Sequence, residues 1–155
     1  MEFEELVQAV QSLNTDDAFR ARLDRVQWRT LAGYLTPHTL RSGELLIREG
    51  EVDRSAYFLG RGSLQVYRVQ SQGGQRVVLL RPGAMVGETG LFAAAPHSVQ
   101  VEAMSPCIVW ALRLPRFEEL CSRTPNLAVE VLRGAGAVIA ARLRAQVDQP
   151  AAVKA

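Results

Sequence analysis

A short segment near the middle of the chain carries residue types that can bind an anion next to hydroxyl groups. Gly87 and Gly90 bracket a carboxylate, Glu88, and Pro96 and His97 follow a short apolar run. Glycine permits turn geometry and close approach to a ligand, and the amide N–H groups of such a turn form a concave anion site. Glu88 repels an anion, so we expect it to accept hydrogen bonds from neighbouring hydroxyl groups. The pattern predicts a site for a phosphate attached to a sugar.

This segment is similar to a known cassette. The run Gly87-Glu88-Thr89-Gly90-Leu91-Phe92, then Pro96, a polar residue and Ser98, resembles the phosphate-binding cassette of cyclic nucleotide-binding domains. The similarity is ordered along residues 39–143, which makes it far more specific than an isolated glycine motif. It is strongest to the sensor half of catabolite-activator-type regulators. The resemblance implies that cyclic AMP (cAMP) or cyclic GMP (cGMP) is the ligand, with no other cofactor.

The resemblance also assigns roles to single residues. The implied ligand-binding residues are Gly87, Glu88, Thr89, Gly90, Leu91, His97, Ser98 and Arg142. Glu88 is expected to contact the ribose, and Thr89 and Leu91 to act through their backbone amides. Arg142 lies where the long helix of the family faces the purine, so it is expected to stack on the base or to supply positive charge. The alternative for Arg142 is an ordinary solvated helix residue.

His97 departs from the pattern, because nucleotide-binding members have at this position the arginine that pairs with the cyclic phosphate. Histidine near neutral pH is mostly uncharged and cannot copy the two-pronged contact of a guanidinium. A hydrogen bond to a charged group contributes roughly 1.5–3 kcal/mol, so the exchange weakens binding by about ten- to a hundredfold. Three interpretations stay open: a protonated His97 binds phosphate, the pocket takes another ligand, or the site has decayed and His97 is a surface residue.

The elements that position these residues follow from the periodicity of apolar side chains. The sequence predicts a mostly β fold with flanking helices (α+β), whose antiparallel jelly-roll or double-stranded β-helix core follows N-terminal helices and precedes a long C-terminal helix. Residues 1–155 form one predicted domain. Its parts are a helical lead (1–36), a β-roll (38–115) with the cassette (86–98), C-terminal helices (116–148) and a tail (149–155).

Three local signals set the boundaries of these elements. Residues 14–17 are interpreted as caps of a second N-terminal helix that carries Phe19 and Leu23. Alternating apolar residues predict a strand over 98–103. Thr124 followed by Pro125 predicts the start of the long helix, because proline suits the first helical position.

The composition argues against several classes of protein. The two histidines, His38 and His97, and the two cysteines, Cys107 and Cys121, do not have the spacing of metal ligands or of a nucleophilic triad, so we expect no metal and no catalysis. No apolar run reaches the roughly 20 residues that span a bilayer, and the acidic N-terminus does not resemble a signal peptide. We therefore expect a cytoplasmic protein with reduced thiols and no membrane contact.

These observations lead to a functional hypothesis. The chain is expected to be a stand-alone, non-catalytic regulatory domain in signal transduction, with a degenerate cassette. It is expected to form a homodimer through the helix over 125–148 and to act on a protein partner. No helix-turn-helix follows that helix in this sequence, so direct DNA binding is not expected. Two alternatives stay open: a ligand-independent protein-interaction module, and a receptor for another nucleotide such as a cyclic dinucleotide.

Overall fold

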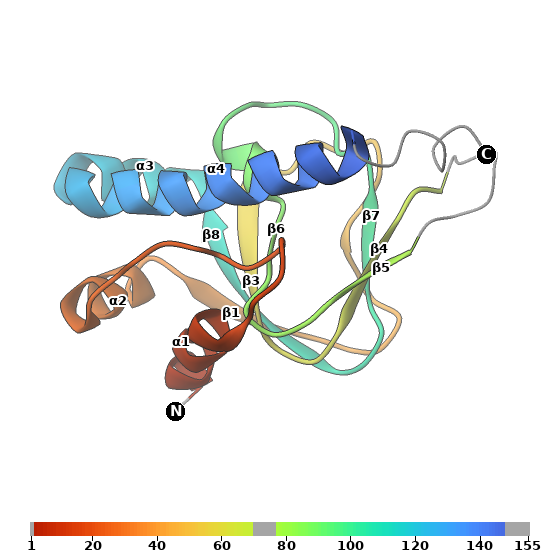
Figure 1. Ribbon diagram of the computed structural model, residues 1–155, viewed down its shortest axis with the longest axis horizontal. Helices are drawn as coiled ribbons and strands as arrows, with labels where there is room; N and C mark the ends of the chain where they lie inside the picture. Colours follow the sequence, from red (N-terminus) through yellow and green to blue (C-terminus); the bar gives the residue numbers. More distant parts are fainter. Residues whose placement is uncertain (1, 70–76, 148–155) are drawn as a thin grey trace.

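The computed structural model describes residues 2–69 and 77–147 and contains two antiparallel sheets flanked by helices (Figure 1). The first half of the chain forms α1 (Glu2–Ser12), α2 (Arg25–Ala32), β1 (Thr36–Leu40), β2 (Leu45–Ile47), β3 (Ser55–Arg61) and β4 (Leu64–Tyr67). The second half forms β5 (Val78–Leu80), β6 (Met85–Val86), the 3-10 helix η1 (Glu88–Leu91), β7 (Gln100–Ala103), β8 (Cys107–Arg113), α3 (Leu114–Arg123) and α4 (Pro125–Val147). The predicted α+β fold with a jelly-roll-like core and a long C-terminal helix is confirmed.

The two sheets face each other as the layers of a roll. One sheet has the strand order β1-β8-β3-β6, and the other has the order β2-β7-β4-β5; all paired strands are antiparallel. Both faces of the two central strands, β3 and β8, are buried. Since side chains alternate across a strand, each of these strands contributes residues to the cores on both sides of the sheet. Phe58 and Leu112 point toward the helices, whereas Leu59 and Val109 point toward the second sheet.

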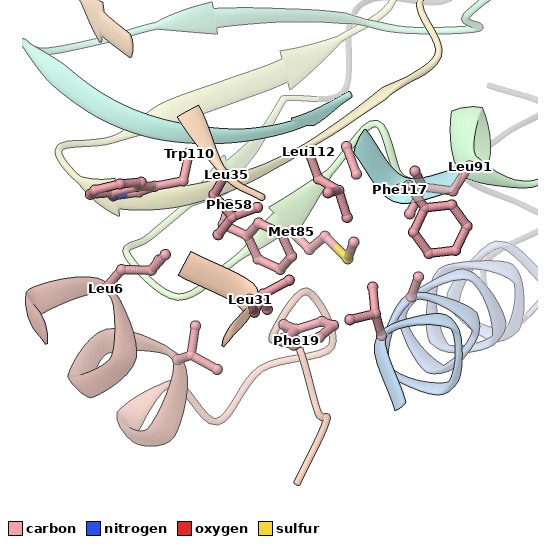
Figure 2. Close-up of a cluster of buried hydrophobic side chains, with 14 of the residues drawn as sticks. Leu6, Phe19, Leu31, Leu35, Phe58, Met85, Leu91, Trp110, Leu112 and Phe117 are labelled. Carbon is pink, nitrogen blue, oxygen red and sulfur yellow. The ribbon is translucent and has the colours of Figure 1, made fainter. Parts of the chain in front are cut away.

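The larger of the two cores lies between the first sheet and the helices. Figure 2 shows Phe19, Phe58 and Met85 side by side in this cluster, and the rings of Phe19 and Phe58 meet edge to face at 4.9 Å. Leu91, from η1, belongs to the same cluster. The cassette is therefore anchored to the core by its own apolar residue.

The N-terminal region differs from the prediction of two consecutive helices. Residues 13–24 are not helical, and α2 begins only at Arg25, where Asp24 and Gln27 form a capping box. Ala18 instead forms an isolated β-bridge with Ala84, and the N–H of Met85 donates to the carbonyl oxygen of Asp17 at 2.9 Å. The second-helix prediction was wrong because pairing with β6 competes successfully with local capping propensity.

The other boundaries differ by only a few residues. The helical lead ends at Ala32, and Pro37 lies inside β1, where it is tolerated because β1 is an edge strand. The strand predicted over 98–103 begins at Gln100, α3 begins at Leu114 rather than at 116, and α4 begins at Pro125 as predicted. The predicted tail, 149–155, and residue 148 lie outside the described residues.

Candidate ligand-binding site

The turn that opens the cassette depends on two glycines. Gly87 has a φ of +76° and precedes η1, and the N–H of Gly90 donates to the Gly87 carbonyl oxygen at 3.0 Å. A Cβ atom on Gly87 would lie 2.8 Å from the carbonyl oxygen of Ser55, and one on Gly90 would lie 2.6 Å from that of Asp53. Both glycines thus allow the cassette backbone to pack directly on the start of β3, which fixes the turn.

Glu88, the expected ribose contact, is buried beside this turn. It is 4% exposed, and its Oε1 accepts a hydrogen bond from Nη1 of Arg142 at 2.6 Å. Glu88 is therefore not a solvated loop carboxylate. Other protein atoms cover the Glu88 carboxylate, and the Arg142 guanidinium supplies part of this cover.

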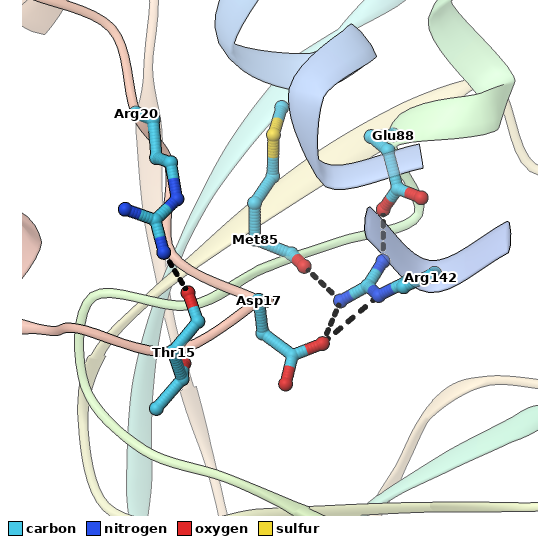
Figure 3. A network of polar contacts seen from close by, with 6 residues as sticks. All are labelled: Thr15, Asp17, Arg20, Met85, Glu88 and Arg142. Carbon is cyan, nitrogen blue, oxygen red and sulfur yellow. Dashed lines mark hydrogen bonds and ion pairs between the residues drawn. The ribbon is translucent and has the colours of Figure 1, made fainter. Parts of the chain in front are cut away.

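Arg142 reaches the cassette from α4 and contacts three groups at once. Besides Glu88, its Nε donates to Oδ1 of Asp17 at 2.9 Å and its Nη2 donates to the carbonyl oxygen of Met85 at 2.6 Å (Figure 3). Burial alone lowers the pKa of Arg142, but the neighbouring carboxylates of Glu88 and Asp17 outweigh it and raise the pKa above its ordinary value. Arg142 thus lies against the cassette, and the alternative of an ordinary solvated helix residue is wrong.

His97 is buried where the cassette leads toward β7. It is 8% exposed, and its Nε2 lies 3.1 Å from the carbonyl oxygen of Asp53. Because a carbonyl oxygen only accepts, Nε2 carries the hydrogen. The backbone N–H of His97 also donates to Glu51, and its carbonyl oxygen accepts from Gly50. His97 thus connects the cassette to the loop before β3, and the interpretation of an ordinary surface residue is wrong.

Asp53 is a residue of this site that the sequence did not single out. Its backbone carbonyl contacts the His97 ring, and its Oδ2 accepts a hydrogen bond of 2.6 Å from the hydroxyl of Tyr57. Burial, and then the Asp53 carboxylate, raise the pKa of Tyr57 to about 12. Next to it, Nε of Arg54 donates to the carbonyl oxygen of Gly90 at 2.8 Å. No local pattern distinguishes Asp53 or Arg54 from other loop residues, which is why both were missed.

The remaining predicted residues are spread around the turn. Thr89 is exposed, Leu91 is buried in the core, and Ser98 is exposed in the bend before β7. Ser98 and His97 line an open hollow of about 320 Å³, together with Glu49, Gly50, Val69 and Gln100. Neither Glu88 nor Arg142 lines this hollow. The structure therefore brings Arg142 to Glu88, while the two residues after Pro96 face a separate depression.

Asp17 is a further residue that sequence reasoning missed. Its local context, between Thr15 and Ala18, was interpreted as a helix cap, and nothing nearby signals a contact with Arg142, 125 residues later. The side chain of Asp17 is 20% exposed.

Within the described residues, no group of three or more histidine, cysteine, aspartate or glutamate side chains is placed to hold a metal ion. No helix among the same residues is long and apolar enough to cross a membrane.

The structure is thus a double-layered antiparallel roll whose glycine-bracketed turn faces a long C-terminal helix. The sequence profile of the cyclic nucleotide-binding domain matches residues 37–124, more than half of the chain. The chain therefore belongs to the cyclic nucleotide-binding domain family.

Similar proteins differ in what surrounds this domain. The chain is 32% identical over 80 residues to the acetyltransferase Pat of Mycolicibacterium smegmatis, a match that covers 52% of this chain and 24% of Pat. It is 31% identical over 97 residues to the cAMP-activated global transcriptional regulator CRP of Pasteurella multocida, covering 61% of this chain and 46% of CRP. The chain thus spans less than half of these two relatives.

Among solved structures, a cyclic nucleotide-binding domain from Methylobacillus flagellatus superposes with a TM-score of 0.81 and 21% sequence identity. The superposition covers 95% of this chain and 81% of that one. At this level of identity the likeness shows the fold, and it extends over the helices as well as the roll.

Proposed function

We propose that this chain is a non-catalytic regulatory domain whose cassette binds cAMP or cGMP weakly. The direct contact between Glu88 and Arg142 carries the proposal, because it joins the two elements that the family resemblance assigns to the ligand. η1 supplies the carboxylate for ribose hydroxyls, and α4 supplies the side chain that faces the base. A ligand seated here touches both elements, so its occupancy biases how α4 packs on the roll.

Weak binding follows from the position of His97. Its Nε2–H already donates to the Asp53 carbonyl oxygen, so a neutral His97 has no second N–H for a phosphate. Protonation adds a hydrogen to Nδ1 and a positive charge, both of which favour an anion. We therefore propose that binding is stronger in mildly acidic solution than in mildly basic solution.

Calorimetric titration of cAMP and cGMP into the wild type and His97→Arg, at pH 6 and pH 8, tests this function. We expect His97→Arg to bind about ten- to a hundredfold more tightly, because a permanently charged guanidinium with several N–H donors replaces the imidazole ring. The wild type should bind more tightly at pH 6, and the variant should show little difference between the two pH values. Failure of both proteins to bind either nucleotide at both pH values would refute the proposal.

A second function, ligand-independent protein interaction, is favoured by the cover over Glu88. Three N–H groups of Arg142 donate to Glu88, Met85 and Asp17, so the guanidinium is held over the Glu88 carboxylate by partners on three sides. In that case the domain acts as a scaffold for a protein partner, and added nucleotides change neither its stability nor its assembly. The titration above separates the two functions.

A cyclic dinucleotide fits this site less well. Its two phosphates require more positive charge than the cluster of Asp17, Glu88 and Arg142 offers, because two carboxylates face one guanidinium. We therefore favour a ligand with one phosphate.

The free thiols of Cys107 and Cys121 suit a reducing compartment, and we propose a cytoplasmic location on that basis.

We also propose that the domain is a homodimer through α4. The helix buries Leu127, Val131 and Val138 against the roll, and two large apolar side chains are exposed on its opposite face. Val129 is 44% exposed and Leu143 is 59% exposed. Gly136 lies between them on the same outward stripe, and a Cβ there would meet nothing within 4 Å. A second copy of the helix can approach closely at Gly136 and cover the two apolar side chains, whose burial favours association.

A further inference from the structure

The segment between α1 and α2 runs alongside α4 and contacts it at two levels. We call residues 13–20 the N-terminal strap. Phe19 packs against Gly134, since a Cβ on that glycine would lie 2.4 Å from Cε1 of the ring. Asp17 bonds Arg142, eight residues further along the helix. Eight helical residues rise about 12 Å, so the two contacts lie roughly two turns apart on α4.

The strap is held in place by the strand that leads into the cassette. The carbonyl oxygen of Asp17 accepts the N–H of Met85, and the carbonyl oxygen of Met85 accepts Nη2 of Arg142. The side chain of Asp17 also accepts a hydrogen bond from Nε of Arg142, so hydrogen bonds connect all three residues to one another (Figure 3). Within the strap, Nη2 of Arg20 donates to the Thr15 carbonyl oxygen at 2.8 Å and supports this turn. The backbone hydrogen bond between Asp17 and Met85 therefore positions the Asp17 side chain for its contact with Arg142.

The same guanidinium covers the carboxylate that a ribose requires. Nη1 of Arg142 lies 2.6 Å from Oε1 of Glu88, whose side chain is 5% exposed, whereas the Arg142 side chain is 29% exposed. A ligand that approaches from solvent therefore meets Arg142 before Glu88. Any interaction that holds Arg142 in this position competes with the ligand.

We propose that Asp17 is a positioning residue that latches the N-terminal strap to Arg142, and that a ligand hydroxyl reaches Glu88 only after Arg142 has left it. Release of Arg142 frees the strap and the end of α4 together, so ligand binding is coupled to both segments. The part that concerns the ligand rests on the proposed function, whereas the latch itself does not.

Amide hydrogen exchange without ligand tests the latch alone. Asp17→Asn keeps the size of the side chain and removes its charge, and Asp16→Asn makes the same change at the exposed neighbouring position. We expect Asp17→Asn to speed exchange roughly tenfold in peptides from the strap and from residues 137–147, while β3 and β8 keep wild-type rates. Asp16→Asn should match the wild type. Equal exchange in wild type and Asp17→Asn would overturn the latch.

Titration of cAMP and cGMP into the same proteins tests the competition. We expect Asp17→Asn to bind about three- to tenfold more tightly than the wild type and Asp16→Asn to bind as the wild type does. General structural damage lowers affinity, so a gain cannot arise from a merely structural role of Asp17. Equal or weaker binding by Asp17→Asn would overturn the competition. If no protein in the set binds nucleotide, the proposed function fails, and the exchange experiment alone decides on the latch.

Discussion

The ring of Phe19 occupies the space that a side chain at Gly134 would need. Gly134 is buried on the inner face of α4, and a Cβ there would lie 2.4 Å from Cε1 and 2.8 Å from Cδ1 of Phe19. The ring cannot move aside easily, because Phe19 is 2% exposed and meets Phe58 and Trp28 edge to face. This contact joins the N-terminal strap to α4 independently of the ion pairs at Arg142.

Gly134→Ala is therefore expected to destabilise the protein, whereas Gly136→Ala, two residues away, is not. Overpacking a buried site costs about 1–3 kcal/mol in the free energy of unfolding. Alanine at the open position 136 should raise that free energy by about 0.5–1 kcal/mol, because glycine is a poor residue inside a helix. Urea denaturation followed by circular dichroism, at one protein concentration, measures the free energy of unfolding of both variants. Equal effects of the two substitutions would contradict the packing described here.

Gly87→Ala is expected to cost more stability than Gly43→Ala, although both glycines have positive φ. The φ values are +76° and +91°, so each alanine pays about 1–2 kcal/mol for a left-handed conformation. At Gly43 a Cβ meets nothing within 4 Å, whereas at Gly87 it lies 2.8 Å from the Ser55 carbonyl oxygen. Denaturation of both variants measures the difference, which isolates the clash. A Gly87→Ala variant as stable as Gly43→Ala would mean that the cassette turn is not packed on β3.

Tyr57 should ionise at unusually high pH. Its pKa is raised to about 12, first by burial and then by the hydrogen bond to Asp53. A neutral phenol is favoured in the folded state, so this contribution to stability is complete below pH 10 and is lost as the pH rises toward 12. Titration of tyrosinate absorbance, with Tyr57→Phe to assign the signal, measures the value.

Asp53→Asn provides the control for this assignment. It removes the carboxylate but leaves the burial of Tyr57, so the pKa should fall and still remain above 10. An unchanged pKa would show that the contact between Tyr57 and Asp53 does not form in solution.

Gly136→Arg should disrupt the proposed dimer, because a long charged side chain at the centre of the outward stripe prevents close approach of two helices. Ala137→Arg is the matched control, since residue 137 is also exposed on α4 but lies about 100° around the helix from the stripe. Light scattering at micromolar concentration should give a dimer for the wild type and Ala137→Arg, and a monomer for Gly136→Arg. A monomeric wild type would refute the proposed homodimer.

The sequence by itself predicted the features that depend on local rules. Alternating apolar residues indicated the strand that became β7, and the pair Thr124-Pro125 indicated the start of α4. The glycine-bracketed carboxylate indicated a special turn at η1. Each of these features is encoded by side chains a few residues apart, because strand pleat, helix capping and positive φ act over that distance.

Only the tertiary structure decided what surrounds Glu88. Arg142 is 54 residues from Glu88 and 125 residues from Asp17 in the sequence, so their contacts depend on how α4 and the strap pack on the roll. The same holds for Asp17 itself, whose local sequence suits a helix cap but whose backbone pairs with β6 instead. The hydrogen bond from His97 Nε2 to the Asp53 carbonyl oxygen, 44 residues away in the sequence, was set in the same way. Long-range packing and hydrogen bonding outweigh local propensities of a few tenths of a kcal/mol, and no short sequence pattern records them.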